Sequence, residues 1–269
     1  MPVLRSIQFL GSSVIGSIEF IGGAGGLLWD AVRSLPAGLF RRRGRRLGWE
    51  NLWAQMVRVG VRSVPIVVLV VFCIGAILAM QMIPVLEGYG AEARAADIIA
   101  IAMVRELGPL VAAIVLTGFA GASIAAEIGS MVVGEEIEAL EAHAISPVRL
   151  LVAPRVLASA VMMVCLAVVA DIVGVLGGMF TAVLAAGLNP TQYVRDTFTS
   201  IDLLDFGTGL VKASVFGVII STLACHLGLR VTGGATGVGN ATTRTVVYTI
   251  VALITVDLLF TGVFYYLEL

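Results

Sequence analysis

Five long apolar runs decide most of what this chain can fold into. They cover approximately residues 64–85, 98–120, 156–186, 206–229 and 246–267. Each run supplies the roughly 20 apolar residues that an α-helix needs to cross the hydrocarbon core of a bilayer. None of them shows the roughly ten-residue alternating segments of a membrane β-strand. We therefore expect an all-α integral membrane protein with five transmembrane helices.

The composition agrees with a membrane protein. Hydrophobic residues make up 59% of the chain and charged residues only 13%, whereas a soluble domain carries about 25% charged residues. Cys73, Cys165 and Cys225 all lie within apolar runs and show no paired spacing, so we interpret them as packing residues rather than disulfides or metal ligands. The two histidines, His143 and His226, are isolated, and no metal site is expected.

The first 63 residues differ from the rest of the chain. Between residues 3 and 35, apolar positions are mixed with charged ones such as Arg5, Glu19 and Asp30. A cleaved signal peptide would have a compact apolar core followed by small residues, and this stretch has neither. We predict an amphipathic helix that lies in the membrane interface. The expected division is an interfacial region, 1–63, and a transmembrane domain, 64–269.

The positions of the arginines predict the orientation. Basic residues concentrate in loops on the cytoplasmic side of a membrane protein. With the N-terminus in the cytoplasm and the C-terminus outside, thirteen of the 17 basic residues lie inside. These are Arg5, Arg33, Arg41, Arg42, Arg43, Arg45, Arg46, Arg58, Arg62, Arg149, Arg155, Arg230 and Arg244. We interpret the basic cluster at 41–46 as an anchor to anionic lipid rather than a nucleic-acid site.

Charged residues inside two of the spans are the strongest functional signal. Residues 105–109 read Arg-Glu-Leu-Gly-Pro within the second span, and Lys212, the only lysine, lies within the fourth. Intramembrane charges cost several kcal/mol unless they are paired or face water. Because Gly108 and Pro109 follow at once, we expect the helix to kink or break there.

Depth predicts that these charges meet. Counted from the outer ends of the predicted helices, Arg105 and Lys212 both lie roughly 10 Å into the outer half of the bilayer. Together with Glu106 they would form a net positive cluster that suits an anionic headgroup such as a phosphate. The alternative is an internal ion pair that locks two helices together.

An acidic segment separates the second and third spans. Near residues 134–146 we predict a short amphipathic helix with Ile137, Leu140 and Ala144 at i, i+3 and i+7. A helix with a few apolar anchors fits a groove on another protein. The alternative is a solvated loop with helical character.

Residues 233–244 are rich in glycine, and we expect a loop there. No strand precedes this segment and no Gly-Lys-Ser/Thr follows it, so neither a dinucleotide site nor a phosphate-binding loop is expected. The pattern from Gly207 to Lys212 fails the same test. The chain therefore does not hydrolyse ATP, and any ATPase must be a partner.

Two further intramembrane carboxylates and two glycines leave alternatives open. Asp171 and Asp257 could relay protons in a secondary transporter, but we favour hydrogen bonds to neighbouring helices. Gly174 and Gly178 allow close packing of helices, either within the subunit or across a dimer.

Taken together, the motifs resemble those of the MlaE-type permeases. They lie at residues 105–109, 126–131, 135–140, 147, 154–155 and 241–247. These permeases serve MCE-protein ABC transporters of Gram-negative bacteria. The resemblance implies a homodimeric permease in the bacterial inner membrane, with an interfacial helix, five transmembrane helices and a periplasmic C-terminus. It further implies phospholipid movement between inner and outer membrane. The implied partners are a cytoplasmic ABC ATPase dimer, a periplasmic MCE hexamer and possible binding of a STAS-domain protein, with no nucleic acid.

The resemblance also implies roles for individual residues. Arg105, Glu106 and Lys212 match charged positions near an outward-open lipid cavity, and Leu78, Val85, Leu86 and Tyr89 match its apolar lining. The residues that match the coupling helix, which docks on the ATPase, are Glu135, Glu136, Ile137 and Leu140. The chain itself would be non-catalytic and would need no cofactor, since the partner ATPase binds ATP.

The second hypothesis is a proton- or ion-coupled secondary transporter that uses Asp171, Asp257 or Glu106.

Overall fold

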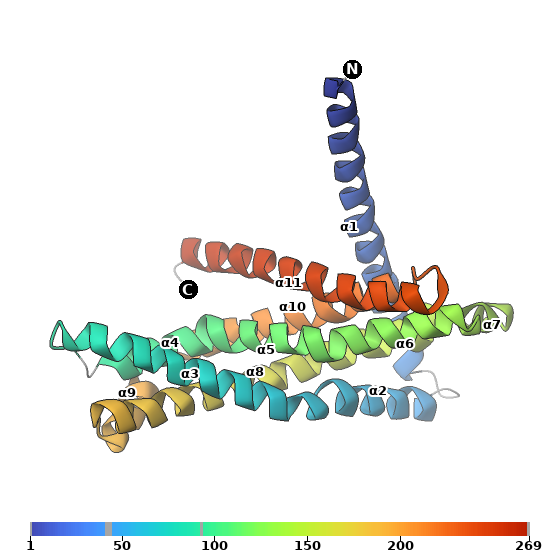
Figure 1. The fold of residues 1–269 in the computed structure, drawn as a ribbon. Coiled ribbons are helices and arrows are strands. Elements are labelled where there is room, and N and C mark those ends of the chain that lie inside the picture. Colours follow the sequence, from blue (N-terminus) through green and yellow to red (C-terminus); the bar gives the residue numbers. More distant parts are fainter. Residues whose placement is uncertain (1, 41–44, 92–93, 268–269) are drawn as a thin grey trace.

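The computed structural model describes residues 2–40, 45–91 and 94–267, and within these ranges every regular element is a helix (Figure 1). The α-helices are α1 (Pro2–Phe40), α2 (Arg45–Val59), α3 (Val64–Glu87), α4 (Ala95–Ala102), α5 (Gly108–Leu116), α6 (Ala122–Val133), α7 (Glu136–Ala142), α8 (Ala153–Ala186), α9 (Pro190–Ser200), α10 (Leu203–Gly228) and α11 (Gly234–Tyr266). Single π-helical turns at Met103–Leu107, Thr117–Gly121 and Val148–Val152 join some of them.

Five helical stretches among the described residues are long and apolar enough to cross a membrane, which confirms the all-α, five-span prediction. They are Trp49–Glu87, Ala95–Val133, Val148–Ala186, Leu203–Gly228 and Gly234–Tyr266. The first begins well before residue 64, because the 3₁₀ turn Val61–Ser63 joins α2 to α3 and the helix continues. Part of the region expected to be interfacial is therefore continuous with the first span.

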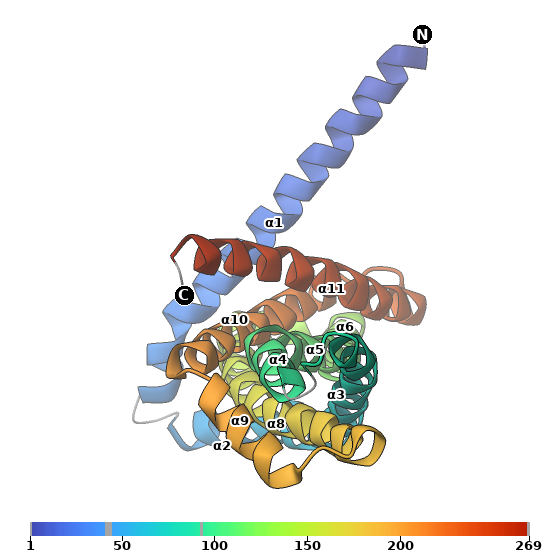
Figure 2. The ribbon, with the colours of Figure 1, turned by 90° about the vertical axis from the view of Figure 1, so that its left-hand side faces the viewer.

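The spans run alternately in opposite directions along one bundle (Figure 1). The short helix α7 lies at one end, and α9 lies at the other together with the start of α4. Helix α1 runs across the long direction of the bundle in Figure 1, and its N-terminal half extends beyond the bundle in both views (Figures 1 and 2). It contacts α2, α8, α10 and the π-helical turn Val148–Val152. This crossed arrangement is the geometry expected for a helix in the membrane plane.

Glycines bring α3 and α8 into backbone contact. A Cβ added at Gly75 would overlap the carbonyl oxygen of Gly174, and one added at Gly177 would overlap that of Phe72. At Gly178 it would lie 2.9 Å from the Ile99 side chain. Small residues let two helix backbones approach where lipid offers no hydrophobic driving force. Gly174 and Gly178 therefore serve packing inside the subunit.

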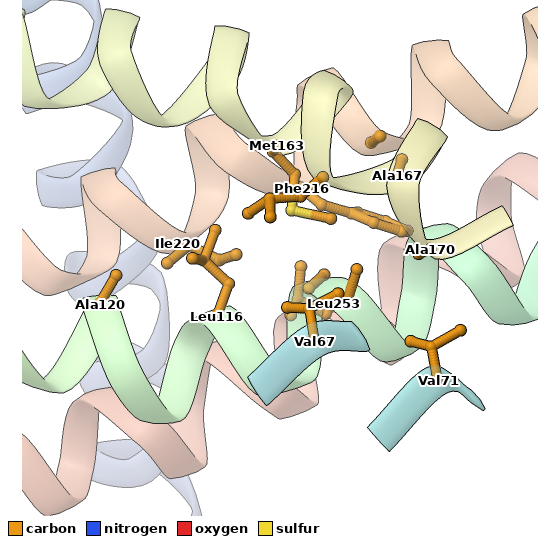
Figure 3. Close-up of a cluster of buried hydrophobic side chains, with 14 of the residues drawn as sticks. Val67, Val71, Leu116, Ala120, Met163, Ala167, Ala170, Phe216, Ile220 and Leu253 are labelled. Carbon is orange, nitrogen blue, oxygen red and sulfur yellow. The ribbon is translucent and has the colours of Figure 1, made fainter. Parts of the chain in front are cut away.

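The centre of the bundle is a continuous apolar cluster (Figure 3). Its fully buried members include Val67, Leu116, Met163, Phe216 and Leu253, which come from five different spans. Interdigitated packing of this kind fixes the relative positions of the spans. It thereby sets which charged residues of neighbouring helices can meet.

The glycine-rich segment is not a loop. Gly233 and Gly234 have φ values of +86° and +69°, and α11 begins at Gly234. Glycine adopts this left-handed backbone without steric cost, so the chain turns there and then enters a helix. The loop predicted for 233–244 was therefore wrong beyond its first residue.

Part of the predicted basic cluster cannot be described. Arg41, Arg42 and Arg43 lie outside the described residues, as do the side chains of Arg45 and Arg46. Their predicted contact with anionic lipid stays a prediction.

Candidate functional site: a charged cavity between three helices

A π-helical turn presents the two charges of the second span. Met103–Leu107 forms this turn, and Pro109 follows at the start of α5. Proline has no N–H to donate to the carbonyl four residues earlier, that of Arg105, so the helix cannot continue regularly through this point. The predicted irregularity is confirmed in the form of a widened turn rather than a break. It carries Arg105 and Glu106.

Lys212 of α10 is buried within a set of polar partners. Its Nζ lies 2.6 Å from Glu106 Oε2 and 3.1 Å from Asp257 Oδ1 of α11. It also donates a hydrogen bond of 3.0 Å to Thr261 Oγ1. The Lys212 side chain is only 1% exposed, and a buried ammonium is tolerated only when it is paired and hydrogen-bonded. The ion pair expected under the helix-locking interpretation is therefore present.

Two further contacts extend this network. Arg105 Nε lies 3.3 Å from Asp205 Oδ1 of α10. Thr261 Oγ1 donates to Glu106 Oε1 at 2.8 Å. The network thus connects the π-helical turn with α10 and α11. Its threonine contacts both the lysine and the glutamate.

The expected net positive charge is not found. Arg105 and Lys212 contribute two positive charges, but Asp205 and Asp257 join Glu106, so the fully ionised cluster carries a formal charge of −1. The prediction from the sequence counted only Arg105, Glu106 and Lys212, which together are net positive. The structure adds the carboxylates of Asp205 and Asp257, and these reverse the sign of the net charge. For Asp257, the ion pair with Lys212 on α10 is a contact with a neighbouring helix, as the favoured interpretation expected.

Helical spacing could have identified some of the missing members. Asp205 lies seven residues before Lys212, and Thr261 lies four residues after Asp257. Side chains at i, i+4 and i+7 share one face of a helix. A search along the helix faces that carry Lys212 and Asp257 would therefore have named Asp205 and Thr261 as candidates, although not which residues they contact.

A cavity of about 370 Å³ opens beside this network. Its lining combines charged, hydroxyl and aromatic side chains: Arg105, Glu106, Thr208, Lys212, Thr261, Phe264 and Tyr265. Lys212 Nζ lies 5.8 Å from the centre of the Phe264 ring, within the range of a cation–π contact. The cavity can therefore offer both donors and acceptors to a polar ligand beside an apolar wall.

The charges lie deeper along their helices than predicted. Arg105 comes ten residues after the start of α4, and Lys212 comes nine after the start of α10. At 1.5 Å per residue these positions are about 14–15 Å along the helices, compared with the predicted 10 Å. Both helices begin earlier than the apolar runs suggested. The match in depth between the two residues is preserved.

The predicted apolar lining does not meet the charged cavity within one chain. Leu78 and Leu86 pack partly against the core, whereas Val85 and Tyr89 are 54% and 83% exposed. None of the four lines the cavity. Their role in a lipid site stays a prediction.

Asp171 of α8 is placed differently from Asp257. It packs against Gly108, where an added Cβ would overlap its carboxylate. Among the described residues, its Oδ1 has no hydrogen-bond partner. The hydrogen bond to a neighbouring helix that we favoured for Asp171 is therefore not found at this atom.

The predicted coupling segment contains a helix of seven residues, α7, at one end of the bundle (Figure 1). Glu136 begins it, and Glu135 precedes it with a left-handed backbone, φ 58°. Ile137 and Leu140 are half-buried on this helix. Ala144 lies beyond the helix with φ 58°, so its predicted place as the third apolar anchor was wrong.

A second ionic cluster joins two motifs that the sequence analysis left separate. Glu127 Oε2 lies 3.0 Å from Arg155 Nη2 and 2.6 Å from Arg58 Nη1. The Arg155 side chain is 3% exposed and also donates to the Leu151 carbonyl at 2.9 Å. Glu127 thereby links α2, α6 and α8 on the side of the bundle that leads into α7. No local spacing signals this pairing, because the three residues are far apart in sequence.

Comparison with known proteins gives consistent matches. Residues 52–263 match the model of the family described as Permease MlaE. A probable ABC transporter permease protein of Rickettsia typhi is 41% identical over 72% of this chain and 74% of its own length. The intermembrane phospholipid transport system permease protein MlaE of Haemophilus influenzae is 30% identical over 98% of both chains. The chloroplastic protein TRIGALACTOSYLDIACYLGLYCEROL 1 of Arabidopsis thaliana is 29% identical over 82% of this chain and 63% of its own length.

Proposed function

Because this chain belongs to the MlaE permease family of ABC transporters, we propose that it moves phospholipids between the inner and outer membranes of a bacterium. The chain is a multi-pass membrane protein and a non-catalytic permease subunit, and its ATPase is a partner protein. The name of the Haemophilus influenzae relative, which spans the full length of the chain, supports the choice of phospholipid as cargo.

The charged cavity is the observation that carries the proposal. A phospholipid headgroup presents a phosphate, and many headgroups also present an ammonium. The Arg105 guanidinium can donate to phosphate oxygens, and the carboxylate of Glu106, 36% exposed, can accept from an ammonium. A cluster with a formal charge of −1 does not favour a purely anionic group. We therefore propose a zwitterionic, amine-bearing headgroup at this cavity.

A homodimer would complete the lipid site. A volume of about 370 Å³ suits a small polar ligand and leaves no room for two acyl chains. Leu78, Val85, Leu86 and Tyr89 on and just after α3 offer apolar surface, and α11 exposes a further apolar face that includes Leu258 and Val263. In our proposal, two copies enclose the acyl chains between these surfaces.

The proposed orientation places α7 in the cytoplasm, where Ile137 and Leu140 dock on the ATPase. The N-terminus is then cytoplasmic and the C-terminus periplasmic, with an MCE hexamer above the outer opening and a STAS-domain protein as a further partner of the ATPase. Closure of the ATPase dimer would move α7, and the Glu127 cluster would carry that movement to α2, α6 and α8. Transport requires that the two resulting states differ in affinity for lipid.

Lipid retention by charge variants tests the headgroup site. We expect Arg105→Glu to lower the phospholipid that copurifies with the permease, measured by mass spectrometry per mole of protein, while the ATPase still copurifies. Arg195→Glu, an exposed position on α9 away from the cavity, is the matched control. Equal retention in both variants would reject the headgroup role.

The energy source separates this proposal from the secondary-transporter hypothesis. We expect transport to stop when the phosphate-binding lysine of the partner ATPase is replaced. Proton-driven lipid transport by the permease without its ATPase would instead support a relay through Asp171 or Asp257.

A further inference from the structure

We propose a second phospholipid site in the groove between α1, α10 and α11, with the lipid phosphate bound by Arg230 and Arg244. This site is separate from the charged cavity and lies toward the opposite ends of the same two helices. It requires only a membrane-embedded chain, so it does not depend on the direction or energy source of transport.

The groove is large and continuous. Its volume is about 1280 Å³, compared with about 370 Å³ for the charged cavity. Helix α1 forms one wall with Phe20, Ala24 and Leu28, and α10 and α11 form the others. All three helices lie together in both views (Figures 1 and 2). A groove of this size can hold the chains of a lipid.

The charged groups of the groove are gathered at one end, whereas Thr222, Tyr248 and Thr255 are polar residues farther along it. Arg230, Thr232, Asn240 and Arg244 line the groove where α10 ends and α11 begins, near the α7 end of the bundle. No aspartate or glutamate lines the groove, and neither arginine forms an ion pair with any residue that the structure describes. Two unneutralised guanidinium groups favour a phosphate, which each can bind through charge-assisted hydrogen bonds.

The part of the groove beyond Arg244 has about the length of the hydrocarbon region of one leaflet. On α11 the lining begins at Gly237, and its part from Arg244 to Val256 is about 18 Å long at 1.5 Å per residue. One leaflet contributes about half of the roughly 30 Å hydrocarbon core. A lipid with its phosphate at Arg244 would therefore have its chains along the apolar part of the groove. In the orientation proposed above, this is the cytoplasmic leaflet.

The contacts of α1 hold the groove open. Phe20 stacks edge-on against His226 of α10 and Tyr248 of α11, with ring centres 5.2 and 5.4 Å apart. Gly23 lies directly on His226, since a Cβ there would come within 2.8 Å of the imidazole. Gly25, one of the lining residues, has no atom within 4 Å of the position of an added Cβ. The contact at Gly23 therefore holds α1 against α10, and the groove stays open beside Gly25.

A second copy of the chain fits this groove less well. An isologous contact would bring the same surface of both copies together. Here it would bury Arg230 and Arg244 of both copies in one interface, and no carboxylate of the described residues lines it. Uncompensated buried charges are strongly unfavourable. The phosphate of a phospholipid supplies the missing counter-charge.

Photocrosslinking tests the site in the permease–ATPase complex. The complex is reconstituted in nanodiscs that contain phosphatidylglycerol with a diazirine near the end of one acyl chain. We expect labelled peptides from α10 and α11 within residues 218–227 and 247–256. The double substitution Arg230→Gln/Arg244→Gln should lower this labelling by about tenfold. Labelling unchanged by the double substitution would overturn the proposal.

A groove-filling variant separates this site from effects on folding. Gly25→Leu should block labelling because its side chain enters the groove, and leucine is a better helix former than glycine. Gly26→Leu is the matched control, since it also has open space but does not line the groove. Equal loss in both variants would count against the site.

Two further measurements distinguish the groove from the charged cavity and from an interface between two copies of the chain. Arg105→Glu should leave labelling of the groove intact, so loss of lipid from the charged cavity and loss from the groove are distinguishable. Rapid disulfide formation between two copies of a Gly25→Cys variant would show that a second copy occupies the groove, and would reject the lipid as its occupant.

Discussion

Lys212 and Glu106 form an ion pair of 2.6 Å whose two members differ sharply in exposure. The lysine side chain is 1% exposed and the glutamate side chain 36%. The ammonium therefore depends on protein partners for its charge to be tolerated, whereas the glutamate also faces the cavity. Lys212 has a structural role in this arrangement, and Glu106 is the member that can exchange partners with a ligand.

Removal of the Lys212 ammonium alone should be more harmful than removal of its charge together with those of Glu106 and Asp257. In Lys212→Met, Glu106 and Asp257 would lose their shared cation, and we expect a loss of about 3–5 kcal/mol in stability. The triple variant Lys212→Met/Glu106→Gln/Asp257→Asn should recover much of this loss, because no unpaired charge remains. Thermal unfolding in detergent compares the two. A triple variant less stable than the single one would contradict the pairing.

The Glu127 cluster predicts unequal effects at its three positions. Glu127→Gln would leave the 3%-exposed guanidinium of Arg155 without a counter-charge, so we expect a loss of about 3 kcal/mol or more. Arg58→Gln removes a partner that is 40% exposed and should cost at most about 1 kcal/mol. Melting temperatures of the two variants check this order. Similar shifts for both would show that burial does not determine the effect.

The two apolar positions of α7 should control ATPase binding. Ile137→Glu/Leu140→Glu replaces the half-buried face of this helix, and we expect the ATPase to be lost on copurification. Glu138→Gln on the exposed side of the same helix is the control and should keep the partner. An unchanged elution volume of the permease would show that its own assembly survives. Full ATPase binding by the double variant would remove α7 from the interface.

Because α3 and α8 are in backbone contact at Gly75, we expect a larger side chain at this position to destabilise the protein. Gly75→Val would force a side chain into the backbone of Gly174, and overpacking typically costs about 1–3 kcal/mol, with more expected where backbone must move. Gly262→Val on α11 has open space and should be tolerated. The yield and melting temperature of each variant in detergent are the measurements. A stable Gly75→Val protein would mean that the two helices can separate.

The apolar runs of the sequence predicted which segments are transmembrane helices better than they predicted where these helices begin and end. The apolar runs identified all five spans, because the requirement to bury backbone polar groups in lipid acts on each segment separately. Their ends were misjudged where polar residues continue a helix, as at the start of α11. Gly233 and Gly234 do turn the chain, but the glycines that follow do not prevent helix formation.

The sequence by itself determined membrane residence, the five spans, the family and the presence of intramembrane charges that need partners. Only the tertiary structure decided which partners those charges have. Lys212 meets Thr261 across 49 residues of sequence, and Glu106 meets the same threonine across 155. Such pairs form because packing of the apolar core fixes the helices in register, and burial then requires each charge to be neutralised by whatever group lies opposite. Asp205 and Asp257 entered the site in this way and changed the sign of its net charge.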